Sequence, residues 1–299
     1  MNSKNLEERV DTLPTALLLA IGDELLNGDV RDANLHRLSR GLTGLGLRAE
    51  EARLIRDAPA QIGRTFRALL ARAPDVLIVS GGLGPTEDDR TLAALADAMG
   101  VQLTAHPKAR ALVEAQYERL LAAGHVAQRG SETIRRKMAR LPEGATPLPN
   151  PRGTAPGIVL AHEGTRIYCL PGVPAELAAI FDGDVVPDLR VHLELGAWVE
   201  VELTIACRDE AAVAAPLREV AVRHPDVYLK SLARAFPEAL EGALRVIAAA
   251  HASDAATARE QAEAALRDLR ERLARAGFSV SEIRSSQHLS SDPREGEIS

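Results

Sequence analysis

A glycine- and acid-rich segment carries the residues best suited to chemistry. The apolar run 76–80 has the length of a buried strand, and the sequence Gly-Gly-Leu-Gly-Pro-Thr-Glu-Asp-Asp follows it at positions 81–89. Glycines permit positive φ values and leave main-chain N–H groups open, and the junction of a strand with a helix N-terminus is a favoured anion site. Carboxylates there would repel a phosphate group unless a divalent cation lay between them. The segment therefore predicts a site for metal and phosphate, although Thr86 or Asp88 could instead cap the helix that follows.

Three further segments share this design. Gly-Asp-Glu at 22–24 follows the apolar run 15–21, and Pro-Gly-Val-Pro-Ala-Glu at 171–176 follows the apolar run 166–170. A glycine–proline turn, Gly-Thr-Ala-Pro-Gly, occupies 153–157. Because the carboxyl ends of strands in a doubly wound sheet meet at one crevice, we expect the four segments to line the same crevice.

The elements that position these segments alternate between strand and helix over residues 15–190. The alternation predicts βαβ units in a three-layer α/β/α domain with a mostly parallel sheet. The expected strands are 15–21, 48–55, 76–80 and 166–170. The expected helices are 33–45, 60–73, 90–99, 107–123, 132–140 and 175–181. The proline- and glycine-rich stretch 141–157 is expected to lack regular structure.

After residue 190 the pattern changes to β-α-β-β-α-β, which is the ferredoxin-like split βαβ arrangement. It predicts a smaller α+β domain over residues 191–285. Its elements, in order, are expected at 198–207, 209–223, 227–232, 243–251, 254–276 and 278–283. Residues 1–14 form an N-terminal tail in this division, and the polar residues 286–299 are expected to be a disordered tail.

Composition limits the class of protein. The length of 299 residues predicts two domains, and the formal charge of −6 argues against a nucleic-acid partner. Residues 191–299 hold no Gly-x-x-Gly loop of the RNA-binding KH type. No apolar stretch reaches the length of a membrane helix, and residues 1–13 carry charges where a secretory signal is apolar. Cys169 and Cys207 lie in separate apolar runs, which favours buried, reduced thiols. We expect a cytoplasmic protein without nucleic-acid or membrane partners.

Several multi-residue motifs occur in an order that resembles the competence-damage-inducible protein A (CinA) family. They are Gly22–Leu26, Asn34, Gly81–Asp89, Leu141–Ala145, Asn150–Gly157 and Leu170–Glu176. The resemblance covers residues 15–190 and implies a MoaB/MogA-like, molybdopterin-binding fold for that domain. The second domain resembles the small α+β domain that follows in this family, and residues 225–231 match it best. Longer members continue into a domain similar to a nicotinamide-mononucleotide deamidase, and this chain, which ends at Ser299, is expected to lack that activity.

The resemblance implies a metal-dependent nucleotide pyrophosphatase. The expected substrate is ADP-ribose, which would be cut to AMP and ribose 5-phosphate with a divalent cation (Mg²⁺, Mn²⁺ or Co²⁺) and no organic cofactor. Relatives of this fold commonly assemble, so a homo-oligomer, either a dimer or a trimer, is expected. Two other functions remain open on the same scaffold. One is binding of molybdopterin, or adenylyl transfer to it, with molybdopterin as the cofactor, and the other is non-catalytic binding or assembly.

The residue chemistry of the four segments agrees with hydrolysis of a pyrophosphate. A cation neutralises phosphate oxygens and lowers the pKa of an attacking water, and Mg²⁺ is usually held by one or two carboxylates. The candidate catalytic residues are Asp23, Asp88 and Asp89, and the candidate metal ligands are Asp23, Glu24 and Asp88. The candidate substrate-binding residues are Gly22, Asn34, Gly81, Gly82, Gly84, Thr86, Arg136, Lys137, Gly153, Thr154, Gly157, Gly172 and Pro174.

Several of these residues have an ordinary structural alternative. Glu24 and Asp89 could be solvated acids that favour a helix start. Arg136 and Lys137 could reach a substrate phosphate or belong to the exposed face of a charged helix. Asn34 could contact a ribose or simply cap a helix.

Overall fold

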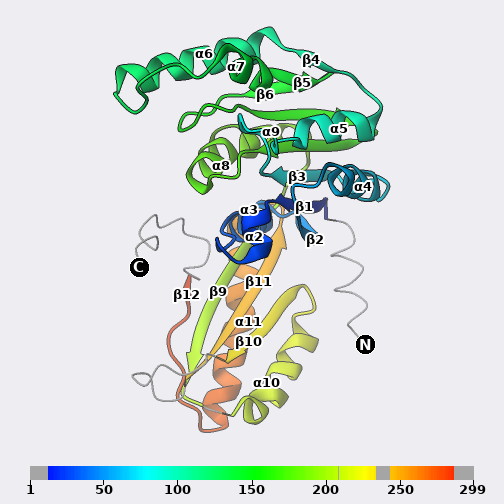
Figure 1. Cartoon of the computed structure of the whole chain (residues 1–299). Coiled ribbons are helices and arrows are strands. Elements are labelled where there is room, and N and C mark those ends of the chain that lie inside the picture. The colour runs from blue at the N-terminus through cyan, green and yellow to red at the C-terminus, as the bar shows by residue number, and fades with distance from the viewer. Residues whose placement is uncertain (1–12, 208, 234–242, 286–299) are drawn as a thin grey trace. The chain divides into compact units, whose positions relative to one another are not determined.

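A computed structural model describes residues 13–207, 209–233 and 243–285 of the chain (Figure 1). Internal contacts divide the chain into two compact units. The larger unit consists of Pro14–Ser39 and Arg48–Glu194, and the smaller one contains Arg40–Leu47 and the described residues from Leu195 onward. Apart from residues 13 and 14, the tails expected at 1–14 and 286–299 lie outside the described residues.

The larger unit is built on a six-stranded, mostly parallel sheet. Its strands, in spatial order, are β2 (Arg48–Ile55), β1 (Thr15–Ile21), β3 (Val76–Ser80), β8 (Thr165–Leu170), β7 (Gly157–His162) and β6 (Thr146–Leu148). The first four run parallel, and β7 and β6 are antiparallel additions at one edge. Ala20 lies opposite Ser80, and Ser80 lies opposite Leu170, so three parallel strands end at the same edge. The predicted α/β class is confirmed.

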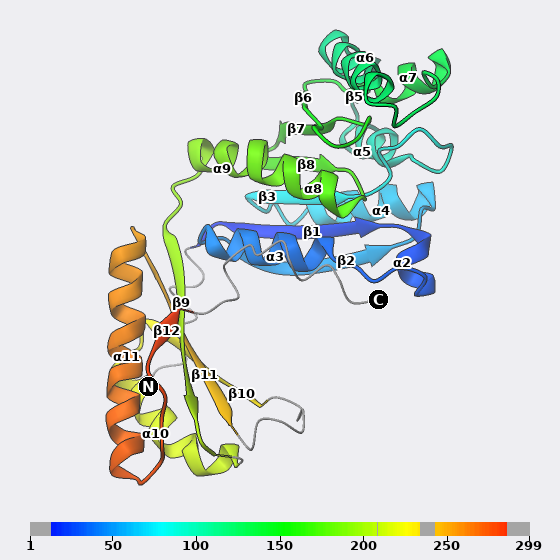
Figure 2. The same cartoon turned by 90° about the vertical axis from the view of Figure 1, so that its left-hand side faces the viewer.

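Helices cover both faces of this sheet, as Figures 1 and 2 show. The flanking helices are α4 (Pro59–Leu70) and α5 (Thr91–Met99) on one face, and α3 (Asn34–Gly44) and α8 (Pro174–Ile180) on the other. β1 and β3 are almost wholly apolar because both of their faces are buried. Leu17 and Leu19 of β1 belong to one core cluster with Phe66 of α4 and Leu95 of α5. This core holds in place the strand ends from which the predicted segments emerge.

An antiparallel strand pair and two helices extend the larger unit between α5 and β6. β4 (Leu103–Ala105) pairs with β5 (Arg140–Pro142), and between them in sequence lie α6 (Pro107–Ala122) and α7 (Glu132–Met138). The prediction that 141–157 lacks regular structure is wrong, because this stretch contributes to β5, β6 and β7. Its prolines are tolerated because β6 is the edge strand of its sheet and β5 belongs to a two-stranded pair.

Further short elements follow the strands. The helix α2 (Asp23–Asn27) directly follows β1 and was not predicted, and neither was β7. Beyond α8, the π-helical turn η1 (Phe181–Val185) and α9 (Val186–His192) lead to the end of the larger unit.

The smaller unit is a four-stranded antiparallel sheet with two helices. Its strands, in spatial order, are β10 (Val227–Ala233), β11 (Leu244–Ala252), β9 (Ala197–Ile205) and β12 (Arg284–Ser285), and its helices are α10 (Glu210–Arg223) and α11 (Ala255–Arg275). The element order confirms the predicted ferredoxin-like split βαβ arrangement. The closing strand expected at 278–283 lies instead after that range, as the two-residue β12. Only a bridge from Val280 to Ile205 precedes β12.

Both cysteines are free thiols, as predicted. Cys169 is buried in β8, and burial raises the pKa of its thiol, which leaves it unreactive. Cys207 is half-buried. In the described part of the chain, no helix combines the length and the apolar character needed to span a bilayer.

Candidate functional site

A cavity of about 440 Å³ lies where the parallel strands of the larger unit end. It is lined by parts of all four predicted segments, so the expectation that they share one crevice is confirmed. The lining residues are Ile21, Gly22, Glu24, Asp57, Gly81–Pro85, Asp88, Asp89, Thr154, Ala155, Pro171–Val173 and Glu176. Among the described residues, five carboxylates line this cavity, and no lysine, arginine or histidine does. We call it the acidic crevice.

Asp23 and Asp57 are joined by reciprocal hydrogen bonds beside the crevice. The Asp23 N–H donates to Asp57 Oδ2 (2.9 Å), and the Asp57 N–H donates to Asp23 Oδ1 (3.3 Å). Asp23 is also ion-paired with Arg56 (3.4 Å) and does not itself line the crevice. Asp57 does line it but was not predicted. Its signal in the sequence was an acid shortly after the strand β2 and just before the start of α4.

The Asp57 carboxyl is half-buried among other acids. Burial is the largest cause that raises its pKa, the hydrogen bond from the Asp23 N–H opposes the rise, and the charges of Glu24, Asp23 and Asp88 add to it. The ionised form of Asp57 is therefore disfavoured in the folded protein. A cation bound between these carboxylates would relieve their mutual repulsion.

The turn after β3 depends on its glycines. Gly81 has a φ of +102°, and a Cβ there would lie 2.2 Å from the Ile21 carbonyl oxygen, so another residue would force the backbone to move. The Gly81 N–H donates to the Leu170 carbonyl (3.0 Å), and the buried Thr91 hydroxyl donates to the Gly81 carbonyl (2.8 Å). The expectation that the Gly81 N–H is open to a phosphate is therefore wrong. Likewise, the Gly22 N–H donates to the carbonyl oxygen of residue 55 (3.1 Å).

Hydrogen bonds to Asp89 hold the second half of the glycine loop. Both the N–H and the hydroxyl of Thr86 donate to Asp89 Oδ2, at 2.8 Å and 2.5 Å. A Cβ at Gly84 would lie 2.7 Å from the same oxygen. Asp89 thus stabilises the loop, and the Thr86 hydroxyl is engaged within it. Asp88 is exposed and lines the crevice, and hydrogen bonding, chiefly with the Thr86 side chain, lowers the pKa of its carboxyl and favours the ionised form.

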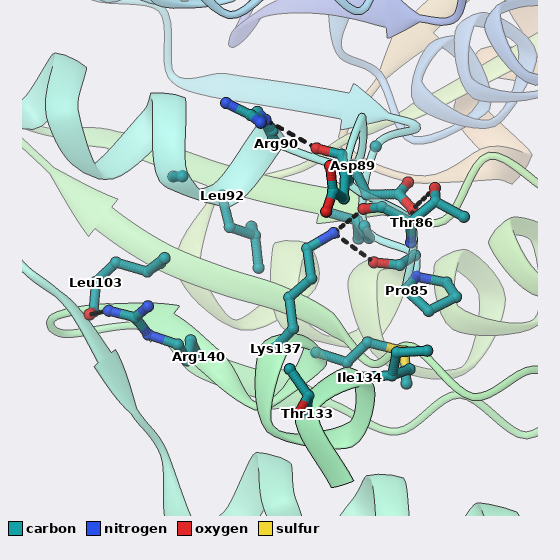
Figure 3. A pocket seen from close by; sticks show the side chains of 16 residues that line it. Pro85, Thr86, Asp89, Arg90, Leu92, Leu103, Thr133, Ile134, Lys137 and Arg140 are labelled. Atoms are coloured by element: carbon teal, nitrogen blue, oxygen red, sulfur yellow. Dashed lines mark hydrogen bonds between the residues drawn. The ribbon is translucent and has the colours of Figure 1, made fainter. Parts of the chain in front are cut away.

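The two basic residues of α7 that were predicted to bind substrate behave differently. Lys137 reaches the glycine loop, where its Nζ donates to the carbonyl oxygens of Thr86 and of Gly84 (3.3 Å for the latter), as Figure 3 shows. Burial lowers the pKa of Lys137, and the charge of Asp89 partly offsets this effect. Arg136 is exposed, forms an ion pair with Glu132 (2.6 Å) on its own helix, and lines neither of the two cavities described for this unit.

Asn34 connects two of the segments that line the crevice, although it does not line the crevice itself. It is buried, and its Nδ2 donates to Ser80 Oγ (2.9 Å) and to the Gly172 carbonyl (2.7 Å). The helix α3 is instead capped by Asp32, whose Oδ1 accepts from the Leu35 N–H (2.8 Å). Asn34 therefore positions the end of β3 against the segment after β8, which is neither of the two roles expected for it.

Asn150 connects two of the predicted segments, 153–157 and 171–176, through hydrogen bonds. Its Oδ1 accepts from the Gly153 N–H (2.8 Å), and its Nδ2 donates to Glu176 Oε2 (2.7 Å). A Cβ at Gly153 would collide with the Glu176 carboxylate. Glu176 lines the crevice but was not singled out, although it lies in a predicted segment. The predicted residues that line the crevice are Gly22, Glu24, Gly81, Gly82, Gly84, Asp88, Asp89, Thr154 and Gly172.

Other predicted residues lie off the crevice. Gly157 begins β7, where a Cβ would meet the Cys169 carbonyl at 3.2 Å, and Pro174 is the first residue of α8. In addition, Gly153 supports the wall without forming part of it. These positions shape the strand and helix ends around the site.

The donor set fits a cation that a ligand helps to hold. In the described part of the chain, no three His, Cys, Asp or Glu side chains gather closely enough to hold a metal ion by themselves. The crevice nevertheless offers the carboxylates of Glu24, Asp57 and Asp88. Mg²⁺ is commonly bound by one or two carboxylates, with waters and phosphate oxygens completing its shell.

The chain is similar in sequence to a known domain family, to proteins of several organisms and to a solved structure. Residues 17–191 match the family described as "Probable molybdopterin binding domain". A protein of Thermococcus kodakarensis is 39% identical over 208 residues, covering 70% of this chain and 81% of that protein. A protein of Aeropyrum pernix is 36% identical over 269 residues, covering 90% and 97%. The crystal structure of the protein CinA from Thermoplasma acidophilum is 32% identical, with a TM-score of 0.52, and covers 58% of this chain and 98% of that one.

Proposed function

Because the chain belongs, through residues 17–191, to the family described as "Probable molybdopterin binding domain", we propose that its acidic crevice binds a phosphorylated ligand of the molybdopterin kind together with a divalent cation. The crevice lies at the carboxyl ends of parallel strands, where open α/β sheets bind their ligands. Its volume of about 440 Å³ is within the usual range for small-molecule sites.

The observation that carries this proposal is the charge of the lining. In the part of the chain that the structure describes, five acidic side chains and no basic ones line a cavity next to a glycine turn. A phosphate group alone would be repelled by these carboxylates. A divalent cation between the ligand and the protein reverses that interaction, because it is attracted to both.

The acidic residues of the crevice have different roles in this proposal. We assign the cation to Asp57 and Asp88, two carboxylates that line the crevice and act on each other electrostatically, with water and ligand oxygens completing its shell. Asp57 takes the place expected for Asp23, because the Asp23 carboxylate is already engaged with Arg56 and with the Asp57 N–H. Asp89 holds the loop from which Asp88 projects. A bound cation would neutralise negative charge on the phosphate oxygens of the ligand.

A second candidate is hydrolysis of a nucleotide pyrophosphate such as ADP-ribose. The observation that favours it is the raised pKa of Asp57, because a carboxylate of higher basicity is better suited to accept a proton. Asp57 would accept a proton from a water molecule while the oxygen of that water attacks one phosphorus of the pyrophosphate. The bond from that phosphorus to the bridging oxygen would break, giving AMP and ribose 5-phosphate.

The third possibility, a non-catalytic binding or assembly protein, predicts that the candidate acids are neutralised by arginines. Of Asp23, Glu24, Asp88 and Asp89, only Asp23 forms an ion pair with an arginine within the described residues. The other three form no ion pair with an arginine there, which supports a site that binds cations.

The test combines binding with turnover. Purified protein is titrated with molybdopterin and, separately, incubated with ADP-ribose, each with Mg²⁺, Mn²⁺ or Co²⁺ and each with EDTA. Saturable, metal-dependent binding of molybdopterin without release of AMP supports the first proposal. Metal-dependent release of AMP supports the second instead. If both compounds are inert in every metal, neither proposal holds.

A further inference from the structure

A second cavity, of about 870 Å³, borders the same glycine loop. It shares Gly82–Pro85 and Asp89 with the acidic crevice, but its other walls come from the rest of the loop and from α5, β4, α7 and β5. Its volume is within the usual range for small-molecule sites. We call it the basic pocket, for the reasons given below.

The walls of the basic pocket are mainly apolar. Leu83 contributes from the loop, Leu92 from α5 and Leu103 from β4, while Ile134 and Met138 contribute from α7. Met138 is buried, and Leu92 and Ile134 are half-buried against the core of the unit. Because these side chains are anchored in the core, they form a preformed surface on which a flat apolar ring can pack.

Cations outnumber acids around this apolar surface. Arg90, Lys137 and Arg140 line the pocket, against Glu87 and Asp89, which leaves a net charge of +1 (three minus two). The acidic crevice, in contrast, has only acids. Two neighbouring cavities on one loop thus have opposite electrostatic character.

The three cations are held by carbonyl oxygens rather than by carboxylates. Arg90 Nε donates to the Glu87 carbonyl (2.8 Å), Arg140 Nη2 donates to the Leu103 carbonyl (2.9 Å), and Lys137 Nζ binds the loop carbonyls. None of the three forms an ion pair with another described residue. In Figure 3, Leu92, Leu103 and Arg140 lie on one side of the Lys137 side chain. The positive charges are therefore fixed in place but not neutralised.

We propose that the basic pocket binds a planar aromatic anion, of the class of aryl phosphates, without a metal ion. Its ring would pack between the leucines of α5 and β4 and the apolar residues of α7. Its anionic group would accept hydrogen bonds from Arg140, which lies on the same side of Lys137 as Leu92 and Leu103 and whose planar guanidinium group suits phosphate oxygens and can also stack on rings. This second site exists whether or not the acidic crevice acts as proposed, because it needs neither the carboxylates of that crevice nor a cation.

The probe for this site is 1-naphthyl phosphate, titrated calorimetrically into the full-length protein in EDTA and again in Mg²⁺. We expect saturable binding at or below about 1 mM, with the same affinity in both buffers. Either fragment alone, 1-naphthol or inorganic phosphate, is expected to bind at least about tenfold more weakly, since each lacks half of the contacts.

Two variants locate the probe, each with a matched control. Arg140→Gln removes a charged donor and should weaken binding about tenfold, whereas Arg64→Gln, at an exposed position on α4 outside both cavities, should leave it unchanged. Ala93→Trp fills the pocket from an exposed position and should abolish binding, whereas Ala122→Trp on α6 should not. Ala93→Trp keeps the test decisive if Arg140→Gln fails to fold.

Three outcomes would overturn the proposal. One is the absence of saturable binding, as expected if another protein surface covers the pocket. A second is undiminished binding to the folded Ala93→Trp variant. The third is binding that needs Mg²⁺, which would place the probe in the acidic crevice.

Discussion

Asp57 and Asp88 follow different strands of the sheet, yet both line the acidic crevice, and the charge of Asp88 contributes to a raised pKa at Asp57. The larger cause of that shift is burial of the Asp57 carboxyl. The ionised Asp57 carboxylate is therefore destabilised in the absence of a cation. Such destabilisation is typical of groups that are organised for a ligand rather than for stability.

The raised pKa of Asp57 predicts a specific dependence of stability on pH. Its pKa is higher in the folded than in the unfolded chain, so the folded state holds its proton to higher pH. Asp57 therefore destabilises metal-free protein as the pH rises from the ordinary range of an aspartate through the raised value. We expect Asp57→Asn to have the higher melting temperature at neutral pH and to lose this advantage in acid.

This prediction is checked by the difference in melting temperature between wild type and Asp57→Asn, measured in EDTA across acidic to neutral pH. A free-energy change of 1 kcal/mol corresponds to about 2–4 °C for a chain of this size class. Glu143→Gln, which neutralises an exposed acid away from both cavities, is the control and should give no such trend. A difference that does not change with pH would contradict the assignment.

Lys137 should hold the glycine loop in its observed conformation. Its ammonium group is the donor that ties the carbonyl oxygens of Thr86 and Gly84 to α7. Lys137→Met keeps most of the apolar stem and removes the donor, so amide hydrogen exchange in residues 84–89 should accelerate about tenfold or more. Lys108→Met, at an exposed position on α6, should leave this exchange unchanged. Equal exchange in both variants would show that the loop does not depend on Lys137.

Gly81 and Gly28 form a matched pair for the geometry of the turn. Both have positive φ, at +102° and +80°, but only at Gly81 would a Cβ meet a backbone atom, the Ile21 carbonyl oxygen. Gly28→Ala should cost about 1–2 kcal/mol from its backbone conformation alone. Gly81→Ala should cost clearly more, because the strand end must also move. Denaturant unfolding measures both, and equal losses would mean that the turn adapts to the side chain.

Much of the fold could be predicted because the strands are continuous apolar runs and the helices have regular apolar spacing. β1, β2, β3 and β8 were located within a residue or so, since strands buried on both faces leave an unbroken hydrophobic signal. The three-residue strands β4, β5 and β6 could not be predicted in this way. They are too short to show a period, and they form only because a partner strand is held opposite them.

The functional site, like the fold, could be predicted only in part. Its convergence on one crevice followed from the position of polar segments after strands, but the role of single residues did not. Asp57 was missed because no glycine turn accompanies it. Asn34 and Lys137 were expected to face the ligand, yet their donors bind loop carbonyls. Sequence spacing shows which residues reach the edge of the sheet and leaves open which hydrogen bonds they form there.

Asp88 is expected to be needed for metal-dependent binding but not for stability. It is exposed and unpaired with any arginine among the described residues, so Asp88→Ala should leave the melting temperature close to that of wild type. The affinity for the phosphorylated ligand in Mg²⁺ should fall about tenfold or more with the loss of a cation ligand. Asp97→Ala, which removes an exposed acid on α5, is the control. Wild-type affinity in Asp88→Ala would remove Asp88 from the site.

The most direct measurement of the central claim is a calorimetric titration of the wild-type protein with molybdopterin, once in Mg²⁺ and once in EDTA. If the acidic crevice binds phosphate through a cation, affinity in Mg²⁺ should exceed that in EDTA by about tenfold or more. The gain should disappear when Asp57→Asn and Asp88→Ala are combined. Equal affinity in the two buffers, or a gain that survives in the double variant, would contradict the account.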